Sequence, residues 1–163
     1  MEGAHKGAHL ECQRNDIAAA SWLTKIQTEG KQGMKIYVTS VFGDGQNKAE
    51  KYYADVLGFK TKHNTPMGAN RWLTVVSDKD PNGTELQLEP SEHPAAKPFK
   101  EALVADGIAA HSFHVQDLDA VTRNLSARGV EFVTEPIDAG PVQMAAFDDT
   151  CGNLIQLIQM KDI

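Results

Sequence analysis

Apolar and polar residues alternate along several short stretches of the chain, and these stretches are rich in β-branched and aromatic residues. Alternation of this kind predicts half-buried strands. The expected strands cover residues 35–42, 59–65, 71–76, 84–89, 109–115, 130–134, 142–147 and 153–159. Residues 47–56 and the segment after Asp117 have apolar residues at helical spacing instead, which predicts two helices. Gly58 and Gly129 follow these helices and are expected to end them.

The predicted elements occur in the same order twice. A strand, a helix and three further strands predict one βαβββ unit over residues 34–90 and a second unit over residues 108–160. Residues 95–105 are expected to form a linker helix between the units. One helix can cover only one face of the four strands in its unit, so the opposite face must bury itself or bind something.

The chain divides first after residue 33. The earliest residues are rich in Gly, His and Ala, which is typical of a tail, and residues 17–26 have apolar side chains at helical spacing, which predicts a short added helix. We therefore treat residues 1–33 as an N-terminal extension, whose native origin the sequence leaves open, and residues 34–163 as the domain. His5 and His9 have a spacing that would suit a shared metal ion, but a terminal tail is the preferred interpretation.

Composition and charge exclude several classes of protein. Hydrophobic residues make up 41% of the chain and charged residues 23%, as in a globular protein. The 16 Lys and Arg residues are outnumbered by 22 Asp and Glu residues, and this acidic balance argues against a nucleic-acid partner. No apolar run approaches the ~20 residues of a membrane-spanning helix. With two cysteines and no visible secretory signal, we expect a cytoplasmic protein.

Two short motifs point to a family. The segment YYADVLGF at residues 52–59 and the turn DTCGN at residues 149–153 resemble the vicinal oxygen chelate superfamily, which includes glyoxalase I, bleomycin- and fosfomycin-resistance proteins, methylmalonyl-CoA epimerase and extradiol dioxygenases. Thr150 stands where the family has proline. The resemblance covers residues 34–160 and implies an α+β fold, in which the two units form one curved, mostly antiparallel eight-stranded sheet around a cup. It also implies a homodimer.

The resemblance places four metal-ligand positions in this sequence. They fall on Val38 and Ala110, which have no donor atoms, and on Gln87 and Gln156, with Glu85 replacing Gln87 if the alignment shifts by two residues. A tight catalytic metal needs about three protein ligands. We therefore expect no metal and no other cofactor, and a divalent ion is disfavoured.

The resemblance also assigns one face of the strands to the cup. His114 lies on that face, and its imidazole, with an ordinary pKa of ~6.5, is the candidate catalytic group; the alternative is a histidine that only shapes the cup or a dimer contact. Trp72 has an alternative place in the core. The ligand-binding residues expected on the cup face are Ser40, Phe42, Trp72, Glu85, Gln87, Ser112 and Gln156.

Other residues that are often functional have simpler interpretations here. Because His111 lies three residues from His114 along its strand, alternation directs the two side chains to opposite faces, and His111 is expected between sheet and helix or at an edge; the alternative is a ligand that rescues a metal site. Packing or surface positions are expected for Tyr52, Tyr53, His63, His93 and Cys151.

Two functional classes follow. The first is a glyoxalase- or dioxygenase-like protein, with lyase, isomerase or dioxygenase activity left open, that binds a small organic molecule in the cup while its metal site is degenerate. The second is a metal-free protein that sequesters a ligand, as bleomycin-resistance proteins do. The sequence does not name the ligand.

Overall fold

A computed structural model describes residues 33–161. The chain divides into two compact parts, Met1–Lys35 and Ile36–Ile163. The second part, Ile36–Ile163, contains every helix and strand described below, and therefore both βαβββ units. The helix expected over residues 17–26, together with His5 and His9, lies outside the described residues.

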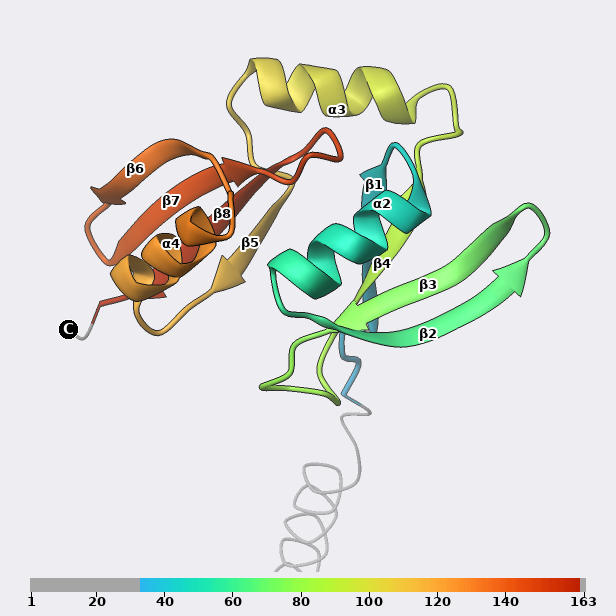
Figure 1. Cartoon of the computed structure of the whole chain (residues 1–163), viewed down its shortest axis with the longest axis horizontal. Coiled ribbons are helices and arrows are strands. Elements are labelled where there is room, and N and C mark those ends of the chain that lie inside the picture. The colour runs from blue at the N-terminus through green and yellow to red at the C-terminus, as the bar shows by residue number, and fades with distance from the viewer. Residues whose placement is uncertain (1–32, 162–163) are drawn as a thin grey trace, which may run out of the picture. The chain divides into compact units, whose positions relative to one another are not determined.

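The first βαβββ unit follows the predicted order (Figure 1). The helix of this unit is α-helical in its first part and continues as a π-helix, η1, in its second part. The elements are β1 (Val38–Gly43), α2 (Gln46–Lys51), η1 (Tyr52–Val56), β2 (Lys60–Met67), β3 (Asn70–Val76) and β4 (Glu85–Pro90).

The linker helix and the second unit complete the fold. They comprise α3 (Ala96–Ala105), β5 (His111–His114), α4 (Leu118–Ala127), β6 (Phe132–Asp138), β7 (Val142–Asp148) and β8 (Leu154–Met160). Gly58 and Gly129 end the two unit helices with φ angles of +83° and +87°, a conformation that a side chain disfavours. The predicted repeat and the α+β class are therefore confirmed.

The strands pair as two sheets. Sheet A has the order β1-β4-β3-β2 and sheet B the order β5-β8-β7-β6. The pairs β1–β4 and β5–β8 are parallel and the others antiparallel, as expected for a mostly antiparallel arrangement. Hydrogen bonds group the eight strands into two sheets of four, and a side-chain contact links their edge strands: Thr39 Oγ1 of β1 lies 3.5 Å from His111 Nε2 of β5.

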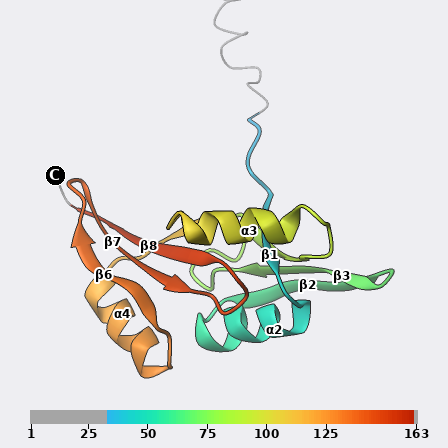
Figure 2. The ribbon, with the colours of Figure 1, turned by 90° about the horizontal axis from the view of Figure 1, so that it is seen from above.

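Each unit buries the helix-facing side of its sheet. Figure 2 shows α2 and α4 on the same side of the strands. Leu86 and Leu88 of β4 pack in a core with Tyr53, whereas Leu157 of β8 packs in a second core with Leu118 of α4. Alternation along β4 and β8 then directs their polar residues to the opposite side, as the sequence predicted.

The two family motifs join the units to each other. The buried Tyr53 hydroxyl donates to Asp149 Oδ2 over 2.9 Å, and the same carboxylate accepts from the backbone N–H groups of Cys151 and Asn153. The Asn153 side chain donates to Asp149 and to the carbonyl of Phe42 at the end of β1. These residues hold the helix of the first unit against the last hairpin of the second.

A buried lysine reinforces this junction. Lys100 of α3 is 5% exposed, and its ammonium donates to Asp44, Ser91 and the carbonyl of Cys151, the last over 2.6 Å. The linker helix is thereby tied to the ends of β1 and β4 and to the turn before β8. Among the described residues, no helix is both long and apolar enough to cross a membrane.

Candidate functional site

The side of sheet A that faces away from α2 carries five of the predicted ligand-binding residues. Ser40 of β1 lies opposite Gln87 of β4, which in turn lies opposite Thr74 of β3. Strand alternation adds the remaining residues of this surface, which we call face A. Face A comprises Ser40, Phe42, Trp72, Thr74, Glu85 and Gln87.

Glu85 is the most unusual residue of face A. Its side chain is completely buried, and Lys62 Nζ of β2 lies 3.1 Å from Oε1, with His63 Nε2 3.6 Å from the same oxygen. Lys62 and His63 are sequence neighbours, so regular alternation would direct them to opposite faces. The register of β2 shifts between Thr61 and His63, and this bulge allows both side chains to reach Glu85.

The surroundings of the Glu85 carboxylate favour its ionised form despite its burial. Desolvation raises the pKa of Glu85, but polar contacts with Thr74, Lys62 and Tyr37 and the positive charge of Lys62 together bring the pKa below its ordinary value. Oε1 is paired with Lys62 Nζ over 3.1 Å, whereas no hydrogen bond of good geometry reaches the buried Oε2 or Thr74 Oγ1. Face A therefore presents a buried carboxylate, one oxygen of which, Oε2, lacks a hydrogen bond of good geometry.

The equivalent side of sheet B, which we call face B, carries the other three predicted residues together with Met144. Ser112 Oγ donates to Gln156 Oε1 over 2.9 Å, and Gln156 Nε2 donates to Met144 Sδ over 2.9 Å. Both ends of the Gln156 amide are thus in use within the chain. Face B comprises Ser112, His114, Met144 and Gln156.

His114 is the last residue of β5 and is exposed. It lines a cleft of about 430 Å³ whose walls come from both units and include Leu57, Phe59, Phe113 and Phe147. None of the other seven predicted site residues lines this cleft. The structure therefore places His114 at the rim of an apolar cleft at the end of its strand.

His111 is the first residue of β5, the edge strand of sheet B. Its Nε2 lies 3.5 Å from Thr39 Oγ1, and its Nδ1 is buried without a hydrogen-bond partner among the described residues. Desolvation lowers the pKa of His111, although the negative charge of Asp149 partly opposes this. His111 therefore belongs to the seam between β1 and β5.

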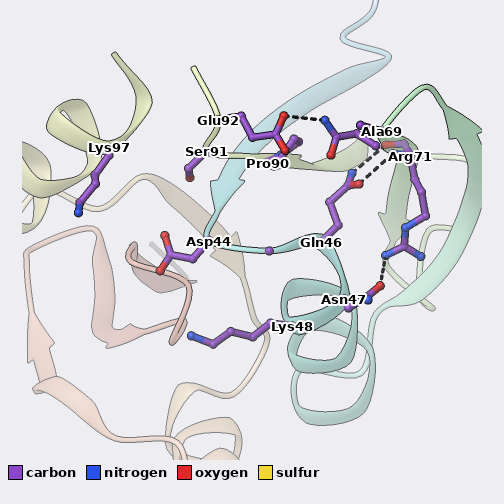
Figure 3. Close-up of a pocket in the computed structure, with 12 residues that line it drawn as sticks. Asp44, Gln46, Asn47, Lys48, Ala69, Arg71, Pro90, Ser91, Glu92 and Lys97 are labelled. Atoms are coloured by element: carbon purple, nitrogen blue, oxygen red, sulfur yellow. Dashed lines mark hydrogen bonds between the residues drawn. The ribbon is translucent and has the colours of Figure 1, made fainter. Parts of the chain in front are cut away.

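A polar cleft of about 770 Å³ opens where β1 and β4 end (Figure 3). Arg71 at its wall bonds Glu50 Oε2 over 2.9 Å and Asn47 Oδ1 over 2.8 Å. The Gln46 side chain donates to the carbonyl of Arg71 and accepts from its N–H. These side chains are already occupied in holding the β2–β3 hairpin against α2, so the cleft is held by structural contacts.

The metal-ligand positions that the resemblance implies can be compared with the donor atoms present. Val38 and Ala110 supply none, and the Gln156 amide is bonded to Ser112 and Met144. Within residues 33–161, no three His, Cys, Asp or Glu side chains gather in a group that could hold a metal ion. Two of the four positions thus carry no donor atom, and the amide of a third is engaged within the chain.

The sequence interpretation missed Lys62 and Thr74 and treated His63 as a simple surface residue. The sequence does contain a signal for Thr74, because Thr74 lies two residues after Trp72 in β3 and therefore on the same face of the strand. Lys62 and His63 reach Glu85 only through the bulge in β2, which has no signal in the sequence.

Comparisons with known proteins agree with this fold. Residues 35–157 match the family model described as the Glyoxalase/Bleomycin resistance protein/Dioxygenase superfamily. The chain is 49% identical over 126 residues to the uncharacterized protein YurT of Bacillus subtilis, and the match covers 77% of this chain and 99% of that protein.

Solved structures extend the comparison. UcmS2 is 26% identical with a TM-score of 0.68, covering 77% of this chain and 98% of that one. TnmS3 of Streptomyces sp. CB03234, described as an antibiotic binding protein, is 26% identical with a TM-score of 0.67, covering 81% of this chain and 100% of that one. A glyoxalase/bleomycin resistance protein of the same organism is 25% identical with a TM-score of 0.57, covering 77% and 100%.

Proposed function

The chain belongs to the Glyoxalase/Bleomycin resistance protein/Dioxygenase superfamily, and we propose that within it the chain binds a small organic molecule without a metal ion. The observation that carries this proposal is the chemistry of the four metal-ligand positions. Two are hydrocarbon side chains, Val38 and Ala110, and at a third the Gln156 amide is already bonded at both ends. A site of this kind lacks the three ligands that a tight catalytic metal requires.

Faces A and B supply what a small-molecule site needs instead. Phe42 and Trp72 are half-buried apolar walls, and Gln87 and Glu85 are buried polar groups beside them. Such a combination of apolar surface and a few converging polar groups is typical of ligand sites. The description of TnmS3 as an antibiotic binding protein supports the same kind of ligand for this chain.

We further propose that the chain is a homodimer. The predicted site residues divide between two sheets, five on face A and three on face B. A second copy would allow face A of one chain and face B of the other to enclose a ligand together. Light scattering should give twice the chain mass of 17.8 kDa at micromolar concentration, and the mass of a single chain would refute the dimer.

The function is tested by a thermal-shift screen of small metabolites and aromatic antibiotics on protein dialysed against a chelator. At least one compound should raise the melting temperature, because a ligand that binds only the folded state stabilises it. Calorimetric titration of that compound into a Gln87→Ala variant should then give weaker binding. A screen without a stabilising compound, or a compound whose affinity is unchanged by substitutions on both faces, would refute the proposal.

A further inference from the structure

Glu85 is a buried acceptor that the chain itself does not use fully. The side chain is 0% exposed, and Lys62 Nζ pairs with Oε1 over 3.1 Å, yet within residues 33–161 no hydrogen bond of good geometry reaches Oε2 or the neighbouring Thr74 Oγ1. Buried polar atoms in native proteins are nearly always hydrogen-bonded. A buried acceptor oxygen, Oε2, that lacks a partner on the face that we assign to ligand binding therefore indicates a donor that comes from outside the chain.

The charge of the cluster decides which donor fits. The carboxylate of Glu85 is paired with an ammonium group, and in such a pair its oxygens accept hydrogen bonds. Lys62 Nζ lies 3.1 Å from Oε1 and is anchored by a 3.2 Å hydrogen bond to the carbonyl of Pro81, so a positive charge is already in place. A cationic ligand would meet repulsion from Lys62, whereas a neutral O–H or N–H group would not.

His63 is the part of the cover over Glu85 that can give way. Its Nε2 lies 3.6 Å from Oε1, beyond hydrogen-bond distance, and its side chain is 41% exposed. Rotation of this imidazole into solvent breaks no hydrogen bond that holds it to Glu85. A ligand group can then take its place beside the carboxylate.

The walls of face A define the rest of the ligand. Phe42 and Trp72 lie on the same side of sheet A as Glu85 and are half-buried. Aromatic side chains favour aromatic partners, by stacking or edge-to-face contact, beyond the area that they bury. A ring that bears a donor group would use both the walls and the carboxylate.

We infer that face A selects aromatic ligands that present a neutral hydrogen-bond donor, such as a phenolic hydroxyl, to Glu85, and that Lys62 excludes cationic ones. This inference rests on the proposed function and names the chemistry of its ligand. Glu85 is the specificity-determining acceptor, and Lys62 sets the charge of the ligand.

The test uses matched probes and the full chain. β-Naphthol and its methyl ether share one ring system, but only β-naphthol has a donor. We expect calorimetric titration to give about tenfold tighter binding of β-naphthol, which corresponds to ~1.4 kcal/mol and is of the size expected for a hydrogen bond to a charged acceptor. Naphthylmethylammonium, the cationic probe, should bind more weakly than β-naphthol.

Three variants assign the preference to its residues. Glu85→Gln keeps the shape of the side chain, and the preference for β-naphthol over the ether should fall to about threefold or less. Glu101→Gln removes the same charge on the exposed surface of α3, at a side chain that is 66% exposed, and should leave the preference unchanged. Lys62→Met should instead strengthen the binding of naphthylmethylammonium about tenfold, and this variant does not depend on the folding of Glu85→Gln.

The possible outcomes separate this inference from the proposed function. Equal affinity for β-naphthol and its ether in the native chain, or a preference that survives Glu85→Gln in folded protein, overturns the role of Glu85. Tighter binding of the ammonium probe than of β-naphthol to the native chain overturns the role of Lys62. Binding of neither naphthalene compound overturns the inference about aromatic donors, whereas the proposed function fails only if the metabolite screen also fails.

Discussion

Removal of a single hydroxyl group, in Tyr53→Phe, tests how the two units are held together. Tyr53 and Asp149 are both 0% exposed, and the hydroxyl donates to Asp149 Oδ2 over 2.9 Å. Hydrogen bonds to a charged acceptor contribute about 1.5–3 kcal/mol, and this acceptor cannot recover its partner from water. We therefore expect Tyr53→Phe to lower the free energy of unfolding by about 2 kcal/mol.

The neighbouring tyrosine provides a matched control. Tyr52 donates to the carbonyl of Asp148 over 3.1 Å in an exposed setting, so Tyr52→Phe removes the same atom from a neutral, solvated bond. Its effect should be about 0.5 kcal/mol. The sequence predicted a packing role for both tyrosines. The difference between the two variants therefore measures how much more the buried Tyr53–Asp149 hydrogen bond contributes to stability than the exposed bond of Tyr52.

Urea unfolding at neutral pH measures the free energy of unfolding of both variants. The dependence of this free energy on urea concentration should be the same in the variants as in the native chain. For a chain of this size, about 2 kcal/mol corresponds to a melting temperature lower by about 4–8 °C. A double-mutant cycle with Asp149→Asn should give a coupling energy above ~1 kcal/mol. If Tyr53→Phe and Tyr52→Phe have equal effects, or if the cycle gives no coupling, the Tyr53–Asp149 bond does not join the units as described.

Two further predictions concern the histidines of β5. His114→Ala should weaken ligand binding by about 1–3 kcal/mol, and because His114 is exposed, it should leave the free energy of unfolding within ~0.5 kcal/mol of the native value. His111→Ala should leave ligand affinity unchanged. If titration and urea unfolding give the reverse result, the roles assigned to the two histidines are exchanged. Because burial lowers the pKa of His111 in the folded chain, the unfolded chain binds more protons below about pH 6.5, so the free energy of unfolding should fall as the pH falls through that value. Urea unfolding at about pH 7.5 and 5.5 should show a smaller decrease in His111→Gln, and an equal decrease would contradict the assignment.

The parts of the fold that the sequence predicted are those set by local periodicity. Leu86 and Leu88 alternate with Glu85 and Gln87, which separates the two faces of β4, and the two leucines pack in the core of the first unit. Gly58 likewise marked the end of the first helix. Patterns of this kind depend only on the residues next to each other in the chain.

The parts that the sequence did not predict depend on contacts between distant residues. Lys62 and His63 of β2 both lie beside the buried Glu85, because a bulge changes the register of the strand. Regular alternation would direct these two neighbouring side chains to opposite faces of the sheet. The grouping of the strands into two hydrogen-bonded sheets likewise depends on pairing between residues far apart in the chain. Neither feature leaves a local signal.

Metal-independent binding is the central claim, and titration calorimetry tests it most directly. The tightest compound from the screen is titrated into protein dialysed against a chelator, and into the same protein supplied with nickel, zinc, iron or manganese. The absence of donor atoms at Val38 and Ala110 predicts equal dissociation constants in every titration, and metal well below one equivalent in the protein as isolated. Binding that appears only after a metal is added would contradict the account.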